Sequence, residues 1–157
     1  MKKYGCAALL MLLSALLWGC VAARDPVLDS LPTYEQGVLH THGSFQDYTD
    51  YGEYTYSGIT AQTLDHNPYL RKVNVEDVAE LAAYLENFEQ WVELAGTCDD
   101  CRLARAYGFS SNLLMQGDYF YLINNAKSPE GIWQYSNYTI YYFSVEKQTL
   151  YYFHNNI

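Results

Sequence analysis

One segment near the middle of the chain constrains the fold most, because its apolar residues recur with the period of an α-helix. Between residues 75 and 95 the apolar positions lie three or four residues apart: Val78, Leu81, Leu85, Phe88 and Val92. This spacing forms a single stripe along one side of a helix. Asn74 is a suitable N-cap and Gly96 can end the helix. We therefore predict an amphipathic helix over about residues 75–95.

Much of the remaining chain alternates like β-strands, and 17 tyrosines are present. The stretch GEYTYSGIT at 52–60 has this alternation. Further strands are predicted at about 109–115, 118–124, 138–145 and 149–155, with the last two forming a hairpin. In the predicted register Phe143 lies opposite Tyr152, and Tyr142 lies opposite Phe153. Both faces of the hairpin are then aromatic, so the helix covers one face and the other needs a second layer, a self-contact or a partner.

These elements predict an α+β fold in which one main amphipathic helix (about 75–95) packs on an antiparallel sheet of 4–5 strands. The stretch 21–33 has two prolines and no periodicity. We therefore expect residues 20–33 to be a tether and residues 34–157 to form a single domain.

The first residues follow the pattern of a secretory signal peptide. Lys2 and Lys3 precede the almost entirely apolar stretch Cys6–Trp18. That stretch is shorter than the roughly 20 apolar residues of a membrane-spanning helix. A basic head followed by a short apolar centre is typical of a secretory signal.

The end of this segment, Leu17-Trp18-Gly19-Cys20, resembles the lipobox of bacterial lipoproteins: leucine, a variable residue, a small residue and cysteine. The resemblance implies that residues 1–19 are removed and that Cys20 carries acyl chains such as palmitate, on its thiol and on the new amino terminus. It implies a lipid-anchored protein of the bacterial cell envelope, and Val21 implies the outer membrane if the host is Gram-negative. Two or more acyl chains make such an anchor stable. The resemblance covers the first 20 residues and implies no activity.

Without residues 1–19 the chain has seven Lys/Arg and 18 Asp/Glu residues, a net charge of −11. This charge argues against nucleic acid as a partner, since phosphate binding requires clusters of Lys and Arg. Residues 75–95 contain six acids and no base, including Glu76, Glu80 and Glu93. We expect most of them to project away from the apolar stripe, either as solvated surface or as a docking face for a basic protein partner.

Cys98 and Cys101 form a CxxC motif. Outside the cytoplasm they most simply form a disulfide. A redox pair or half of a zinc site are the alternatives, although Asp99 and Asp100 oppose the electropositive setting that a thiolate needs. His40 and His42, two apart on a strand, are the paired candidates for a metal site. We expect no metal ion and no cofactor.

The chain lacks the nucleophile elbow, the phosphate-binding glycine loop and the HExxH motif. We expect a non-enzymatic protein-binding module of accessory, inhibitor or immunity type. The alternative is a carbohydrate- or small-ligand-binding lipoprotein that uses a tyrosine-rich sheet face. A hydrolase with scattered carboxylates is a third reading. The candidate binding surface comprises Tyr142, Tyr151, Phe153, Glu76, Glu80 and Glu93.

Overall fold

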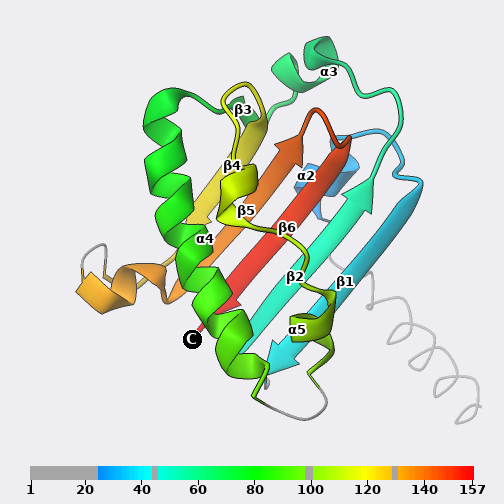
Figure 1. Cartoon of the computed structure of the whole chain (residues 1–157). Helices are drawn as coiled ribbons and strands as arrows, with labels where there is room; N and C mark the ends of the chain where they lie inside the picture. The colour runs from blue at the N-terminus through cyan, green and yellow to red at the C-terminus, as the bar shows by residue number, and fades with distance from the viewer. Residues whose placement is uncertain (1–24, 44–45, 98–100, 129–130) are drawn as a thin grey trace, which may run out of the picture.

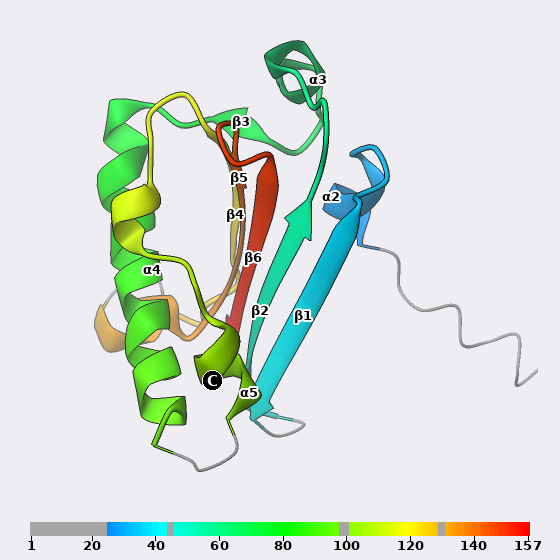
Figure 2. The same ribbon diagram turned by 45° about the vertical axis from the view of Figure 1, so that its right-hand side comes forward.

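The structure, a computed structural model, describes residues 25–43, 46–97, 101–128 and 131–157. One long helix lies across a twisted antiparallel sheet (Figures 1 and 2). The elements in chain order are α2 (Pro26–Asp29), β1 (Gln36–Gly43), β2 (Tyr48–Thr55), α3 (Ala61–Asp65), β3 (Arg71–Lys72), α4 (Val75–Ala95), α5 (Arg102–Ala106), η1 (Ser111–Leu113), β4 (Tyr119–Asn124), η2 (Gly131–Tyr135), β5 (Asn137–Ser144) and β6 (Thr149–Asn156).

The predicted α+β fold is confirmed, with six strands where four or five were expected. The strand order is β1-β2-β6-β5-β4-β3. The C-terminal strand β6 therefore lies inside the sheet, where it pairs with β2 on one side and with β5 on the other. Three details differ from the expectation. β3 was not predicted, the strand expected within 52–60 is β2 and ends at Thr55, and the expected strand at 109–115 contains instead the short 3-10 helix η1.

Helix α4 has the bounds and caps that its sequence predicts, with Asn74 as N-cap and Gly96 as C-cap. Asp77 in the first turn accepts a hydrogen bond from the backbone N–H of Asn74 at 2.8 Å. It also forms a salt bridge with Arg71 at 2.7 Å. Along the apolar stripe the exposed fractions of Leu81, Leu85 and Phe88 are all 0%, and these side chains pack on the sheet in one cluster.

The final hairpin forms where predicted, but its pairing is shifted by two residues. Phe143 lies opposite Leu150, and Tyr142 lies opposite Tyr151. The turn occupies the four residues between Ser144 and Thr149, and Gln148 adopts a positive φ of 51° there. A shift of two leaves every side chain on its predicted face, because the side-chain period of a strand is two.

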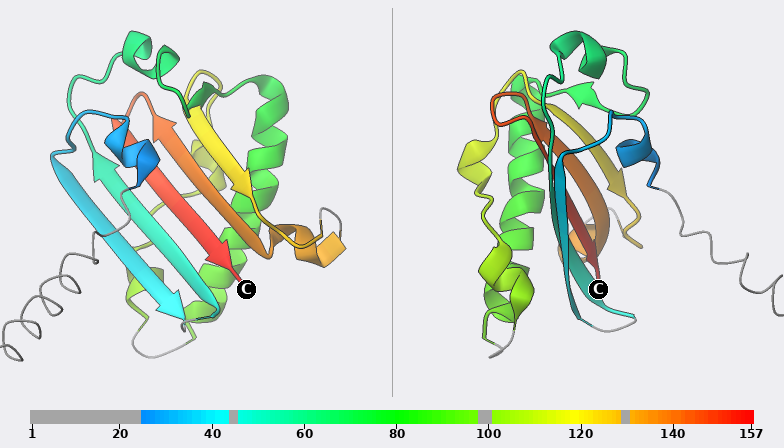
Figure 3. Two further views of the ribbon diagram at one scale, coloured as in Figure 1. Left: turned by 180° about the vertical axis from the view of Figure 1, so that it is seen from behind. Right: turned by 90° about the vertical axis from the view of Figure 1, so that its right-hand side faces the viewer.

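The chain itself covers part of the second sheet face, as Figure 3 shows. Val27 and Leu31 from the α2 segment pack there in one cluster with Phe143 and Leu150. Asp25 caps α2 and accepts a hydrogen bond from the Tyr141 hydroxyl at 2.7 Å. The folded domain therefore begins by Asp25, within the stretch expected to be a tether. The tether prediction failed here because α2 is one short turn, too short to show a helical period.

Candidate functional site

The hairpin aromatics that we expected to form a binding surface lie beneath α4. The exposed fractions of Tyr142, Tyr151 and Phe153 are 0%, 6% and 0%. The Tyr142 hydroxyl donates a hydrogen bond to the buried carboxylate of Asp118. This corrects the predicted surface: alternation places these three residues on the face that the helix covers, and their role is to form the core.

A row of aromatic rings follows the opposite face of the sheet instead, from β4 through β5 and β6 to β2. Successive ring centroids are separated by 6.3, 5.1, 6.4 and 5.1 Å. The row, hereafter the tyrosine face, consists of Tyr121, Tyr141, Tyr152, His154 and Tyr48. Tyr141 is buried and the other four are partly exposed. Period-two alternation from the predicted residues could have found Tyr141 and Tyr152, but the contacts with β2 and β4 depend on the sheet order.

His154 lies partly buried on this face, beside groups that act on its pKa. Burial lowers the pKa of His154, although the nearby Asp50 carboxylate acts in the opposite direction. Its Nδ1 lies 2.8 Å from the Thr139 hydroxyl. Asp50 pairs directly across from His154, and its buried Oδ1 has no hydrogen-bond partner within the described part of the chain. The tyrosine face is thus polar at its β2 end and aromatic at its centre.

The exposed side of α4 carries several carboxylates, as the sequence predicts. Glu76, Glu80, Glu86 and Glu93 are exposed, and among the described residues no base forms a salt bridge with them. The other two acids of α4 have partners. Asp77 forms a salt bridge with Arg71, and Glu89 accepts a hydrogen bond from the backbone N–H of Ser111 at 3.0 Å. We call the four exposed glutamates the acidic face.

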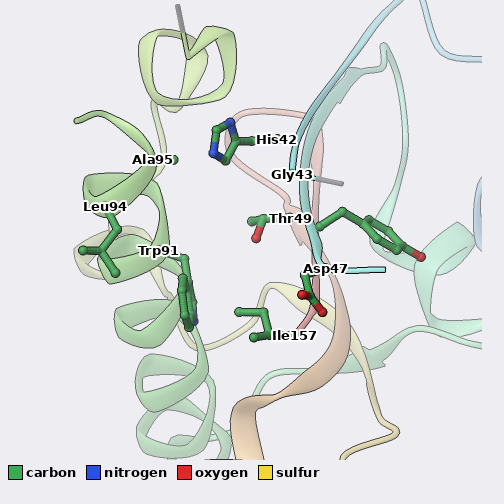
Figure 4. Close-up of a pocket in the computed structure, with 9 residues that line it drawn as sticks. His42, Gly43, Asp47, Thr49, Trp91, Leu94, Ala95 and Ile157 are labelled. Atoms are coloured by element: carbon green, nitrogen blue, oxygen red, sulfur yellow. The ribbon is translucent and has the colours of Figure 1, made fainter. Parts of the chain in front are cut away.

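A pocket of about 370 Å³ opens between the C-terminal half of α4 and the β1–β2 hairpin (Figure 4). Trp91 and Ile157 face each other across it, and Leu94 and Ala95 extend its apolar wall. The polar side chains come from the hairpin. The full lining is His42, Gly43, Asp47, Tyr48, Thr49, Trp91, Leu94, Ala95 and Ile157.

The structure brings His42 to Cys101, a contact that the sequence did not reveal. The Cys101 sulfur lies 3.5 Å from His42 Nδ1, and the buried Cys101 has no disulfide partner among the described residues. Cys98 lies outside the described residues, so the disulfide stays a prediction, as does lipidation of Cys20. His40 lies half-buried on the same face of β1 as His42. Within the described ranges, no three His, Cys, Asp or Glu side chains gather in a way that could hold a metal ion.

None of the described helices combines the length and apolar character that crossing a membrane requires. Comparisons with protein-family models, with curated proteins and with solved structures find no match to this chain.

Proposed function

We propose that this protein is a lipid-anchored lipoprotein of the bacterial cell envelope and acts as a non-enzymatic module that binds a basic protein partner. The acidic face of α4 is the observation that carries the proposal. Its carboxylates are exposed and without salt bridges to described bases, while the opposite side of the helix is fixed in the core. Like charges gathered on the exposed side of one helix attract a surface of opposite charge and speed its association.

The position of the predicted anchor supports this docking face. Cys20 precedes Asp25 by five residues, a span of at most about 18 Å when fully extended. Asp25 is bound to Tyr141 on the sheet face opposite α4 (Figure 3). A lipid on Cys20 therefore holds the domain close to the membrane by its tyrosine-face side. The acidic face then points away from the membrane, toward soluble or membrane-spanning partners.

The anchor is tested by mass spectrometry of the protein purified from membranes. We expect a chain that begins at Cys20 with acyl chains on its thiol and amino group. A chain with an unacylated Cys20 would contradict the lipoprotein assignment and leave the acidic face to be tested separately.

Partner binding is tested by charge reversal with a matched control. Full-length protein is cross-linked in envelopes, and captured proteins are identified by mass for three forms: the native protein, Glu76→Lys/Glu80→Lys/Glu93→Lys, and Asp29→Lys/Asp47→Lys/Glu146→Lys. All six acids are exposed, and both variants change the net charge equally. We expect a basic partner to be lost from the first variant and kept by the second. Equal retention or equal loss in both variants would refute the acidic face as the docking site.

A second function is favoured by the continuous row of rings on the tyrosine face, which offers stacking surface to a carbohydrate. Its test is binding of soluble N-acetylglucosamine oligomers to the full chain, measured by calorimetry. We expect Tyr152→Ala to abolish any binding there, while Trp133→Ala, at a residue 58% exposed elsewhere, leaves it unchanged. Absence of binding to the native protein would remove this alternative.

A further inference from the structure

The two edges of the sheet differ sharply. One edge is β3, which has only two residues, Arg71 and Lys72, both exposed and both basic. Short length and positive charge are two devices by which proteins prevent an edge strand from pairing with another chain. The other edge, β1, has eight residues, and its sequence QGVLHTHG contains no Lys, Arg, Asp, Glu or Pro. β1 therefore lacks both of these devices, although α5 packs on its C-terminal end.

The β1 edge also exposes apolar side chains on both of its faces. Val38 and Leu39 are 51% and 53% exposed, and they point to opposite faces because they are neighbours in a strand. β2 pairs with one side of β1 along its full length. On the other side, every second residue of an edge strand presents an unpaired N–H and C=O. A further strand can form backbone hydrogen bonds with these groups.

We propose that a second copy of this chain pairs with β1, strand against strand and antiparallel, so that two six-stranded sheets become one continuous sheet. The two-fold axis of such a pair is perpendicular to the sheet, and symmetric pairing of this kind is the commonest way in which a chain assembles with itself. The proposal concerns a surface distinct from the acidic face, and only the argument from the direction of the anchors rests on the proposed function.

The distribution of charge favours a second copy despite the acidity of the chain. The strand at the joint is uncharged, so no like charges meet along it. Glu35 is exposed just before β1 begins, and α5, which bears the exposed Arg102, lies at the other end, where Cys101 contacts His42. Antiparallel pairing places Glu35 of each copy at the α5 end of the other. Glu35 of one copy therefore approaches the end of the other that carries Arg102 and the exposed Asp47. Repulsion between acids across the joint is screened by salt.

The direction of the predicted anchors agrees with the same arrangement. A two-fold axis perpendicular to the sheet turns equivalent faces of both copies to the same side. In each copy Asp25 lies on the face opposite α4 (Figure 3). Both anchors would therefore reach one membrane, and confinement there raises the effective concentration of the pairing edges.

The test is sedimentation equilibrium of the full chain in detergent, with hydrogen exchange measured across the same concentrations. We expect a monomer–dimer equilibrium in which the β1 amides exchange more slowly as dimer accumulates. Leu39→Lys, and independently Val38→Lys on the other face, should weaken dimerisation at least about tenfold by placing charge at the joint. The control is Val75→Lys, which makes the same charge change at a residue 70% exposed on α4 and should leave dimerisation unchanged.

Three outcomes would overturn the proposal. One is a chain that stays monomeric throughout. Another is a dimer that all three lysine variants weaken equally. The last is a monomer whose β1 amides become protected only when a different protein is added, because the edge would then receive a foreign strand.

Discussion

Asp118 is a buried carboxylate that holds two parts of the fold together. One of its oxygens accepts a hydrogen bond from the Tyr142 hydroxyl, and the other accepts one from the backbone N–H of Val145 at 2.9 Å. The same Tyr142 hydroxyl also accepts a hydrogen bond from the backbone N–H of Met115 at 2.9 Å. A single acid thus connects the start of β4, the centre of β5 and the turn before β6.

Replacing Asp118 by alanine should therefore destabilise the protein strongly. The substitution leaves the Val145 N–H without its acceptor. It also removes one of the two acceptors near the Tyr142 hydroxyl, the other being the Leu113 carbonyl at 3.1 Å. We expect a loss of about 3 kcal/mol in the free energy of unfolding. Urea denaturation of the full chain measures it. Asp29→Ala, at an exposed acid, is the control and should change stability by less than about 0.5 kcal/mol. A similar small change for Asp118→Ala would show that these bonds contribute little.

The sequence predicted correctly that the α4 glutamates are exposed, and wrongly that the hairpin aromatics form a binding surface. Glu76, Glu80 and Glu93 are exposed as expected, because a helix with a clear apolar stripe leaves its other positions in solvent. Tyr142 and Phe153 were placed on a common face correctly, yet which face the helix covers is a tertiary property. Two aromatic faces carry no local signal that distinguishes them.

Among the elements, α4 was predicted to the residue because its signals are local: the 3.6-residue period, the N-cap and the closing glycine. The segment 109–115 was predicted wrongly as a strand. Its apolar residues Phe109, Leu113 and Leu114 do pack on the main core, but they do so around a 3-10 turn. A short apolar run without a clear period does not distinguish these conformations.

The packing of α4 predicts which of its leucines contribute to stability. Leu85 is fully buried in the middle of the helix, whereas Leu94 on the same helix is 59% exposed. Leu85→Ala should lower the free energy of unfolding by about 3 kcal/mol, since it removes buried methyl groups and leaves a cavity. Leu94→Ala should change it by less than about 0.5 kcal/mol. Chemical denaturation compares the two, and equal effects would contradict the described orientation of α4.

The whole molecule depends on contacts between distant parts of the chain, and this limited what the sequence could show. β6 is the last strand in sequence yet lies between β2 and β5. The residues of the tyrosine face and of the pocket therefore come together only when these strands pair. The contact of His42 with Cys101 joins residues 59 positions apart. Fold class and the exposure of the α4 acids depend on local pattern and were predicted from the sequence, whereas these juxtapositions depend on strand order.

The tyrosine-rich interior makes the entire fold sensitive to alkali. In eleven described tyrosines the pKa is raised, in each case mainly because burial disfavours the charged phenolate. Tyr119, whose hydroxyl also donates to Asp65, has a pKa of about 12. The unfolded chain therefore releases protons at lower pH than the folded one, and stability falls as pH rises above the ordinary tyrosine value of 10.0.

We expect the melting temperature to drop steeply above that pH, with tyrosinate absorbance appearing in step with unfolding. Melting curves and absorbance recorded on one sample test this. Titration of most tyrosines near pH 10 while the fold stays intact would contradict the described burial.

The binding of a basic protein partner that we propose for α4 can be followed directly at the glutamates of the acidic face. Carboxyl footprinting tests it most directly, by comparing chemical labelling of acidic side chains in the isolated full chain and in its cross-linked complex. We expect labelling of Glu76, Glu80 and Glu93 to fall in the complex, while Asp29, Asp47 and Glu146 are labelled as in the isolated chain. Unchanged labelling of the three α4 glutamates in a complex that protects other acids would contradict it.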